Sequence, residues 1–224
     1  TLMRRMGPLR ANWQRTYLLE QIPSLEERRC DLTGETVPYD LLDPRLSARV
    51  NDWFERTGLG YQLEVDCDRK AFSVDVVEKD TGLLIGGLPD VGFGVRQVLP
   101  IAVNCLRGDS GTTLVEQPEL HLHPRMQANL GDLFCAATKT TEAGVASSSD
   151  AQFVIETHSE HLLWRIQTLV RKGELKPSDV AIVHIGKGPE GAEAQELRLD
   201  SDGEFLDWWP DDFFEKEFGE RFGG

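Results

Sequence analysis

The stretch Thr112–Pro124 reads TTLVEQPELHLHP and carries the strongest fold signal in the chain. Its first four residues are β-branched or aliphatic, which predicts a short buried strand. The strand ends abruptly at Glu116, and polar and acidic residues follow it. In open α/β sheets ligands bind at the carboxyl edge, where such residues lie. A carboxylate there can hold Mg²⁺, or its waters, beside a nucleotide phosphate.

A second strand ends in the same way. Phe153–Ile155 is apolar and is followed by Glu156, Thr157 and His158, after which a helix is predicted from Glu160 to about Lys172. A histidine at a strand end can contact a γ-phosphate or the attacking water. The two segments therefore predict one polar cluster at a shared sheet edge.

A glycine-containing turn provides the third segment. Gly92, Phe93 and Gly94 lead directly into a predicted helix, and Gly94 lies 22 residues before Glu116. Free backbone N–H groups at a helix start can bind an anion. A plain tight turn is the alternative interpretation, because glycine pairs before helices are common.

The rest of the chain predicts an α/β protein in which short apolar strands alternate with helices, an arrangement typical of a parallel sheet. Four strands are predicted outside the segments above, at 61–66, 71–78, 180–185 and 196–199. Residues 186–189 read as the turn between the last two strands. Two helices are predicted, one over 95–106, kinked or started near Pro100, and one over 124–137 with proline in its first turn. The small, polar residues 138–150 predict an exposed, mobile loop.

Composition excludes several classes of protein. The 224 residues carry a formal charge of −14, with 40% hydrophobic and 28% charged residues, which is unlike disordered, collagenous or membrane proteins. The negative charge argues against a protein that coats nucleic acid with a general basic surface. No apolar run is long enough to cross a bilayer, and the arginine-rich start does not have the apolar stretch of a signal peptide, so we expect neither feature. Four widely spaced cysteines indicate a reducing compartment, so a cytoplasmic protein is expected.

Together the three segments resemble the second half of an ABC-type ATPase head, and most closely the bacterial AAA-like ATPases of the OLD-related group that carry a DUF3696 region. The resemblance runs from about residue 7 to the C-terminus. It implies an α/β P-loop ATPase fold with a mostly parallel sheet flanked by helices. It also implies ATP and Mg²⁺ as cofactors, and a homodimer that sandwiches nucleotide between its subunits. By analogy with such proteins, the role would be anti-phage defence or DNA processing beside a nuclease or other effector, with contact to nucleic acid through the assembly and none to a membrane.

The resemblance assigns roles residue by residue. Glu116 takes the Walker B position and would hold Mg²⁺ through water. Gln117 falls where most ABC-type ATPases have the glutamate that activates water; an amide cannot accept that proton but can orient water. His158 matches the switch histidine. The signature turn contains Gly92, where serine is usual, Phe93 and Gly94, and the candidate nucleotide contacts are these three residues with Glu119.

One departure from the family is decisive. The phosphate-loop pattern Gly-x-x-x-x-Gly-Lys-Ser/Thr does not occur in the chain. In the resembling proteins that loop lies near the N-terminus, so we expect residues 1–224 to be the C-terminal portion of one head, partnered by a half that carries the loop. Alone this portion should bind nucleotide poorly. Its expected parts are 1–87, a helical and strand part; 88–185, the signature, Walker B and switch core; and 186–224, an acidic extension.

Two other functions stay open. In the first, Gln117 makes the protein a non-hydrolysing, nucleotide-sensing scaffold that recruits an effector. In the second, His121 and His123 lie on one side of an extended segment and form a metal-dependent hydrolase site with Glu116 or Glu119, while Glu156, His158 and His161 form another. The alternative is a structural role, in which His121 and His123 shape a subunit contact or cap the next helix.

Overall fold

The computed structural model describes residues 3–8, 12–142, 145–148, 151–189 and 191–208. Contacts divide the chain into two compact units, 1–158 and 159–224. Within the described ranges, no helix is long and apolar enough to cross a membrane. The expected division at 87/88 and 185/186 stays a prediction.

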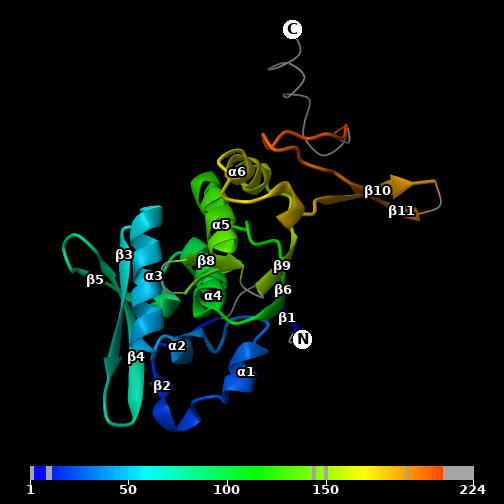
Figure 1. Cartoon of the computed structure of the whole chain (residues 1–224). Coiled ribbons are helices and arrows are strands. Elements are labelled where there is room, and N and C mark those ends of the chain that lie inside the picture. The colour runs from blue at the N-terminus through cyan, green and yellow to red at the C-terminus, as the bar shows by residue number, and fades with distance from the viewer. Residues whose placement is uncertain (1–2, 9–11, 143–144, 149–150, 190, 209–224) are drawn as a thin grey trace. The chain divides into compact units, whose positions relative to one another are not determined.

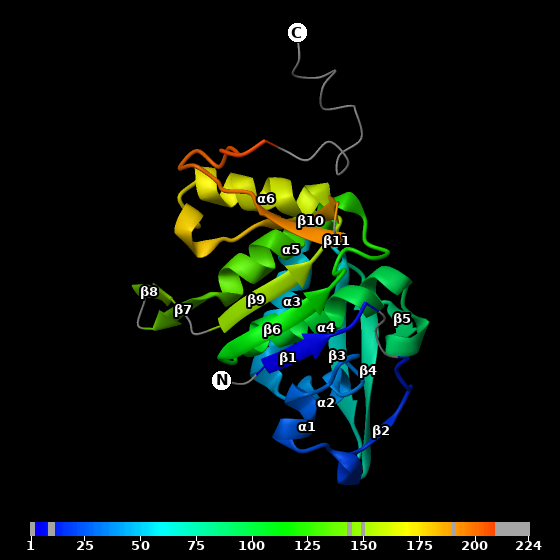
Figure 2. The same ribbon diagram turned by 90° about the vertical axis from the view of Figure 1, so that its right-hand side faces the viewer.

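A three-stranded parallel sheet forms the centre of the first unit. Its order is β1 (Met3–Met6), β6 (Gly111–Glu116) and β9 (Ala151–Glu156). α4 (Phe93–Arg107) and α5 (Pro124–Ala137) lie against one face of this sheet (Figure 2). That face is buried because Thr113 and Val115 of β6 point into it, and Phe153 of β9 meets Phe134 of α5 with ring centroids 5.1 Å apart.

The opposite face of the parallel sheet is open to solvent. Met3 is 68% exposed and Val154 54% exposed, although both lie in strands, and the Arg5 side chain is 63% exposed. The strand register places these residues on the same face as Leu114, Glu116 and Glu156. Parallel sheets are almost always covered on both faces, so this uncovered face is unusual.

An antiparallel sheet makes up the other part of the first unit. Its strands are β2 (Tyr17–Leu18), β4 (Ala71–Glu78) and β3 (Tyr61–Cys67), with β5 (Leu84–Gly87) also paired to β4. α3 (Pro44–Thr57) packs against β3 (Figure 1) and buries Val50 and Phe54. It begins at the Asp43 cap and ends at Gly58, which takes the left-handed conformation with φ 70°. The short elements are η1 (Leu19–Gln21), α1 (Leu25–Arg29), α2 (Val37–Asp40) and η2 (Leu88–Asp90).

The second unit contains one helix and one hairpin. α6 (Glu160–Arg171) begins at Ser159, whose hydroxyl accepts a hydrogen bond from the Leu162 backbone nitrogen, and is followed by η3 (Pro177–Asp179). β10 (Val183–Gly188) and β11 (Gly191–Glu196) pair in antiparallel fashion.

Most of the predicted elements are confirmed, and three expectations are wrong. Residues 138–150 contain the strands β7 (Lys139–Glu142) and β8 (Val145–Ser148), which pair with each other, where a mobile loop was predicted. Residues 186–188 belong to β10 and are not a turn. The last two strands are antiparallel and shifted in sequence from the predicted ranges, because glycines read as a turn are tolerated inside a hairpin strand.

Candidate functional site

The two polar strand ends lie side by side. β6 and β9 are neighbours in the parallel sheet, and their register pairs Glu116 with Glu156. Directly after this pair the backbone nitrogen of Gln117 donates to the carbonyl oxygen of Glu156 at 2.8 Å. The predicted convergence of polar residues at the carboxyl edge is therefore present in the structure.

Glu116 faces an arginine that the sequence did not single out. Its Oε1 accepts a hydrogen bond from Arg5 Nε at 2.6 Å, and the Glu116 side chain is 24% exposed. The hydrogen bond and charge of Glu116 raise the pKa of the Arg5 guanidinium. Because Arg5 is mostly exposed, this pair can open without disrupting buried packing.

Glu119 joins the segment after β6 to the segment after β9. One carboxylate oxygen accepts from Thr157 Oγ1 at 2.8 Å, and the other accepts from the backbone nitrogen of His158 at 2.6 Å. The structure thus commits the carboxylate of Glu119, expected as a nucleotide contact, to holding Thr157 and His158. The His158 side chain is exposed at the same edge.

The backbone after β6 adopts conformations that side chains rarely take. Gln117 has φ 43° and His121 has φ 59°, whereas most residues with positive φ are glycines. Each such residue costs about 1–3 kcal/mol, and strain of this kind is concentrated at functional sites. The Gln117–His121 loop is therefore held in place by its surroundings and not by its own preferences.

The glycine turn before α4 contacts this loop. The ring of Phe93 lies edge-on to the ring of His121, with centroids 4.7 Å apart. A Cβ on Gly94 would lie 3.4 Å from the carbonyl oxygen of His121, whereas a Cβ on Gly92 would meet nothing within 4 Å. All three predicted segments are thus linked through the residues between Gln117 and His121.

An ion pair fixes the approach to the turn. Both terminal nitrogens of Arg15 donate to the carboxylate of Asp90 at 2.7 Å, and Asp90 Oδ2 also accepts from the backbone nitrogen of Gly87. Arg96, in the first turn of α4, donates to the carbonyl oxygen of Pro89. The sequence did not predict the Arg15–Asp90 ion pair because its two residues lie 75 positions apart.

The histidines do not form a metal site. His123 caps α5, its Nδ1 accepting from the backbone nitrogen of Arg125 at 3.3 Å, while the ring of His121 lies against Phe93. Across the described ranges, no group of three or more His, Cys, Asp or Glu side chains is arranged to hold a metal ion. One or two carboxylates at a strand end, such as Glu116 and Glu156, fit Mg²⁺, which usually binds proteins this way and takes its other ligands from phosphates and water.

Residues 13–163 match the family described as "AAA domain, putative AbiEii toxin, Type IV TA system". No curated protein matches the chain.

Three solved structures of SMC proteins are similar to the chain. The SMC head bound to the C-winged helix domain of ScpA has a TM-score of 0.50 and 11% identity. The match covers 69% of this chain and 43% of that one. A structure described under ATP-driven dimerization and DNA stimulated activation of SMC ATPases has a TM-score of 0.49 and 10% identity, over 71% and 87% of the two chains. The SMC head with an extended coiled coil and the C-terminal domain of ScpA, from Pyrococcus furiosus, has a TM-score of 0.49 and 9% identity, over 68% and 34%. The likeness is one of fold, that of an SMC head.

Proposed function

The chain belongs to this family of AAA domains, and from that membership we propose that it forms the nucleotide-handling part of an ABC-type ATPase head. The observation that carries the proposal is the convergence of the strand ends: Glu116 beside Glu156, with Glu119 tying His158 to the same edge. Ligands of α/β sheets bind at such an edge. We assign ATP and Mg²⁺ as the cofactors.

Each residue of the edge has a proposed task. Glu116 holds the hydration shell of the ion, which supplies neutralisation of phosphate charge when it is bound. Gln117 orients water through its amide, and His158 contacts the terminal phosphate. The turn at Gly92–Gly94 presents backbone N–H groups at the start of the fifteen-residue helix α4, where they suit an anion.

The phosphate loop comes from a segment outside these 224 residues. The motif does not occur in the sequence, and the face of the parallel sheet that contains Leu114 and Val154 is uncovered. A phosphate loop joins a strand to a helix, and such a unit suits a parallel sheet with one open face. We therefore propose that the missing half of the head covers this face.

The wider role follows from the family resemblance. We assign the protein to the OLD-related group with a DUF3696 region, acting in the bacterial cytoplasm in anti-phage defence or DNA processing beside a nuclease or other effector. Two heads would sandwich nucleotide, so that the turn at Gly92 of one subunit meets phosphates bound by its partner.

The test uses the full-length protein. Dimerisation with and without ATP is measured by analytical ultracentrifugation, together with ATP affinity and turnover, for the wild type, Glu116→Gln and His158→Ala. We expect each substitution to slow turnover at least about tenfold, a barrier increase of about 1.4 kcal/mol. The control Glu20→Gln changes an exposed carboxylate outside the site. Unchanged ATP binding, dimerisation and turnover in both site variants would refute the proposal.

A non-hydrolysing sensor is the second candidate. Gln117 cannot act as a general base, and Glu116 is paired with Arg5, two observations that favour slow or absent turnover. Replacing the phosphate-loop lysine separates the candidates: a measurable turnover that this change abolishes excludes the sensor. Nucleotide-dependent dimerisation with no turnover supports it.

A further inference from the structure

Five arginines converge at the opposite, amino-terminal edge of the parallel sheet. They come from four elements: Arg4 from β1, Arg28 and Arg29 from the end of α1, Arg49 from α3 and Arg107 from the end of α4. We call them the arginine cluster. Arg4 donates to the carbonyl oxygen of Ser110, just before β6 begins, which fixes the cluster at this edge.

Two aspartates connect four of the arginines. Asp109 accepts from Arg107 Nε at 2.6 Å and Arg29 at 2.8 Å, and Arg4 approaches it to 3.4 Å. Asp40 pairs with Arg107 at 3.0 Å and with Arg28 at 3.1 Å. Arg49 adds a further positive charge close to Gly108, the residue between Arg107 and Asp109. Its Nη1 lies 4.0 Å from the position that a Cβ on Gly108 would take.

The cluster has more positive than negative charge. Among the buried and half-buried members, Arg4, Arg28, Arg29 and Arg107 stand against Asp31, Asp40 and Asp109, which gives 4 − 3 = +1, in a chain whose total is −14. The Asp31 carboxylate is occupied by the backbone N–H groups of Thr33, Gly34 and Thr36. A positive excess at a largely buried site is costly unless an anion or water compensates it.

The hydrogen bonding is incomplete in the same place. The Nε atoms of Arg4, Arg28 and Arg29 are buried and have no acceptor within the part of the chain that the structure describes. Arg4 as a whole is only 5% exposed. Buried donors are normally satisfied, so a group of them beside unbalanced positive charge points to a missing acceptor.

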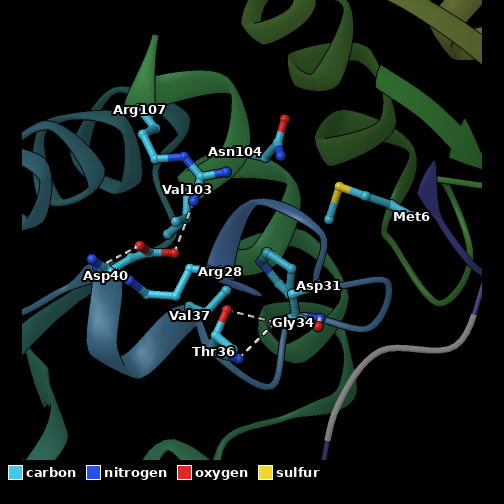
Figure 3. Close-up of a pocket in the computed structure, with 11 residues that line it drawn as sticks. Met6, Arg28, Asp31, Gly34, Thr36, Val37, Asp40, Val103, Asn104 and Arg107 are labelled. Carbon is cyan, nitrogen blue, oxygen red and sulfur yellow. Dashed lines mark hydrogen bonds and ion pairs between the residues drawn. The ribbon is translucent and has the colours of Figure 1, made fainter. Parts of the chain in front are cut away.

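A small cavity lies beside two of these arginines, Arg28 and Arg107. The carboxylates of Asp31 and Asp40 also line it; Asp40 is paired with both arginines, and Asp31 accepts from backbone N–H groups. The interior volume of the cavity is about 20 Å³ (Figure 3). That volume admits one water-sized group, such as one oxygen of an oxyanion. Arg28 and Arg29 reach solvent, with side chains 22% and 37% exposed, so an anion can approach from outside.

We propose that the arginine cluster is a binding site for a phosphate group, separate from the edge at Glu116. One phosphate oxygen enters the cavity between Arg28 and Arg107, and the exposed arginines Arg29 and Arg49 meet the remaining charge. Arginine suits this role because its planar guanidinium binds phosphate in bidentate fashion and stays charged. The phosphate is either free or part of a nucleic-acid backbone.

The experiment measures binding of inorganic phosphate by calorimetry, and of fluorescein-labelled single-stranded and duplex DNA by anisotropy, all at matched ionic strength. Arg28→Gln and Arg49→Gln are compared with Arg69→Gln, which removes an exposed arginine from the β3–β4 turn. We expect each cluster variant to weaken phosphate binding about tenfold and the control to stay within about twofold of the wild type. Arg28→Lys retains the charge and should recover part of the affinity.

The phosphate and DNA assays distinguish the two possible sources of the phosphate group. Binding of inorganic phosphate without DNA identifies a small-anion site. DNA binding that competes with phosphate, and whose salt dependence falls by about one unit for each arginine removed, identifies a nucleic-acid backbone. Circular dichroism and thermal melting establish that the variants are folded. Failure of the wild type to bind either probe, or equal binding by folded Arg28→Gln, Arg49→Gln and wild type, would overturn the proposal.

Discussion

The carboxylate of Glu119 accepts a hydrogen bond of 2.6 Å from the backbone nitrogen of His158, a residue 39 positions later in the chain. The same carboxylate accepts from the Thr157 hydroxyl, so the segments after β6 and β9 are held by one side chain. Hydrogen bonds to a charged acceptor are about twice as strong as neutral ones. A displacement of the loop after β6 is therefore transmitted to the histidine.

The first prediction concerns this link. Glu119→Gln keeps the size of the side chain but removes the charge, and one end of the amide no longer accepts a hydrogen bond. We expect a loss of about 1–3 kcal/mol in the free energy of unfolding, measured with urea. Faster hydrogen exchange at the His158 amide should accompany it, while Glu20→Gln should change neither quantity. Wild-type exchange at His158 in the variant would show that Glu119 does not hold this segment.

The conformation of Gln117 gives a second prediction. At φ 43° a side chain is strained, and a β-branched one more so. Gln117→Val should destabilise the fold by about 1–2 kcal/mol. Gln117→Gly should have a net effect of less than about 1 kcal/mol, because relief of strain offsets the added freedom of the unfolded chain. Chemical denaturation of both variants checks the order, and equal stabilities would contradict it.

A third prediction tests the turn before α4. Gly92 is the N-cap of this helix without a capping side chain, its φ of −59° suits any residue, and a Cβ there meets open space. Gly92→Ser should therefore fold normally and gain a few tenths of a kcal/mol from the cap. Gly94→Ser is the matched comparison: a Cβ there would contact the His121 carbonyl oxygen at 3.4 Å and its hydroxyl would not be at the cap, so it should gain less stability than Gly92→Ser in thermal melts. The reverse order would disprove this description of the turn.

Local patterns predicted the elements whose signals were strong. The helix expected over 124–137 has those bounds, because proline starts it and small polar residues follow it. β6 extends one residue beyond each end of the predicted strand. The β7–β8 pair was missed because its residues lack an apolar alternation, and only their pairing with one another reveals a hairpin. Trp208 is 92% exposed, and the part of the expected acidic extension from residue 209 onward lies outside the described residues.

The candidate site was predictable only in part. Glu116, Gln117 and His158 were found because they follow apolar strands, and the parallel register then brings the strand ends together. The contacts that organise the edge could not be predicted from the sequence. The pairs Arg5–Glu116, Glu119–His158 and Arg15–Asp90 join residues 39 to 111 positions apart. Arg4, Arg5 and Arg15, close to the start of the chain, each pair with a carboxylate in this way.

A fourth prediction tests packing in the second unit. Gly203 has φ 76°, and a Cβ there would lie 2.3 Å from the carbonyl oxygen of Gln167 in α6. Gln167 also donates from Nε2 to the carbonyl oxygen of Gly203 at 2.8 Å. Gly203→Ala should therefore cost about 2 kcal/mol or more through strain and displaced backbone. Gly173→Ala shares the positive φ but has no neighbour within 4 Å, so hydrogen exchange in α6 should rise more for Gly203→Ala.

The fifth prediction uses the two aspartates of the arginine cluster, whose pKa values move in opposite directions. Burial raises the pKa of Asp40 more than Arg107 and Arg28 lower it, whereas at Asp109 the arginines prevail over burial and lower the pKa. Charged Asp109 thus stabilises the fold above its unfolded pKa of about 3.9, and this is lost as the pH falls through its folded value. Asp109→Asn should cost about 3 kcal/mol at pH 7, a gap that closes in acid. The folded state favours the protonated form of Asp40, so Asp40→Asn should lower the free energy of unfolding by less than Asp109→Asn does. The difference between Asp40→Asn and the wild type should begin to change above pH 4. Urea unfolding from pH 3 to 7 measures both, and parallel pH profiles would contradict the assignment.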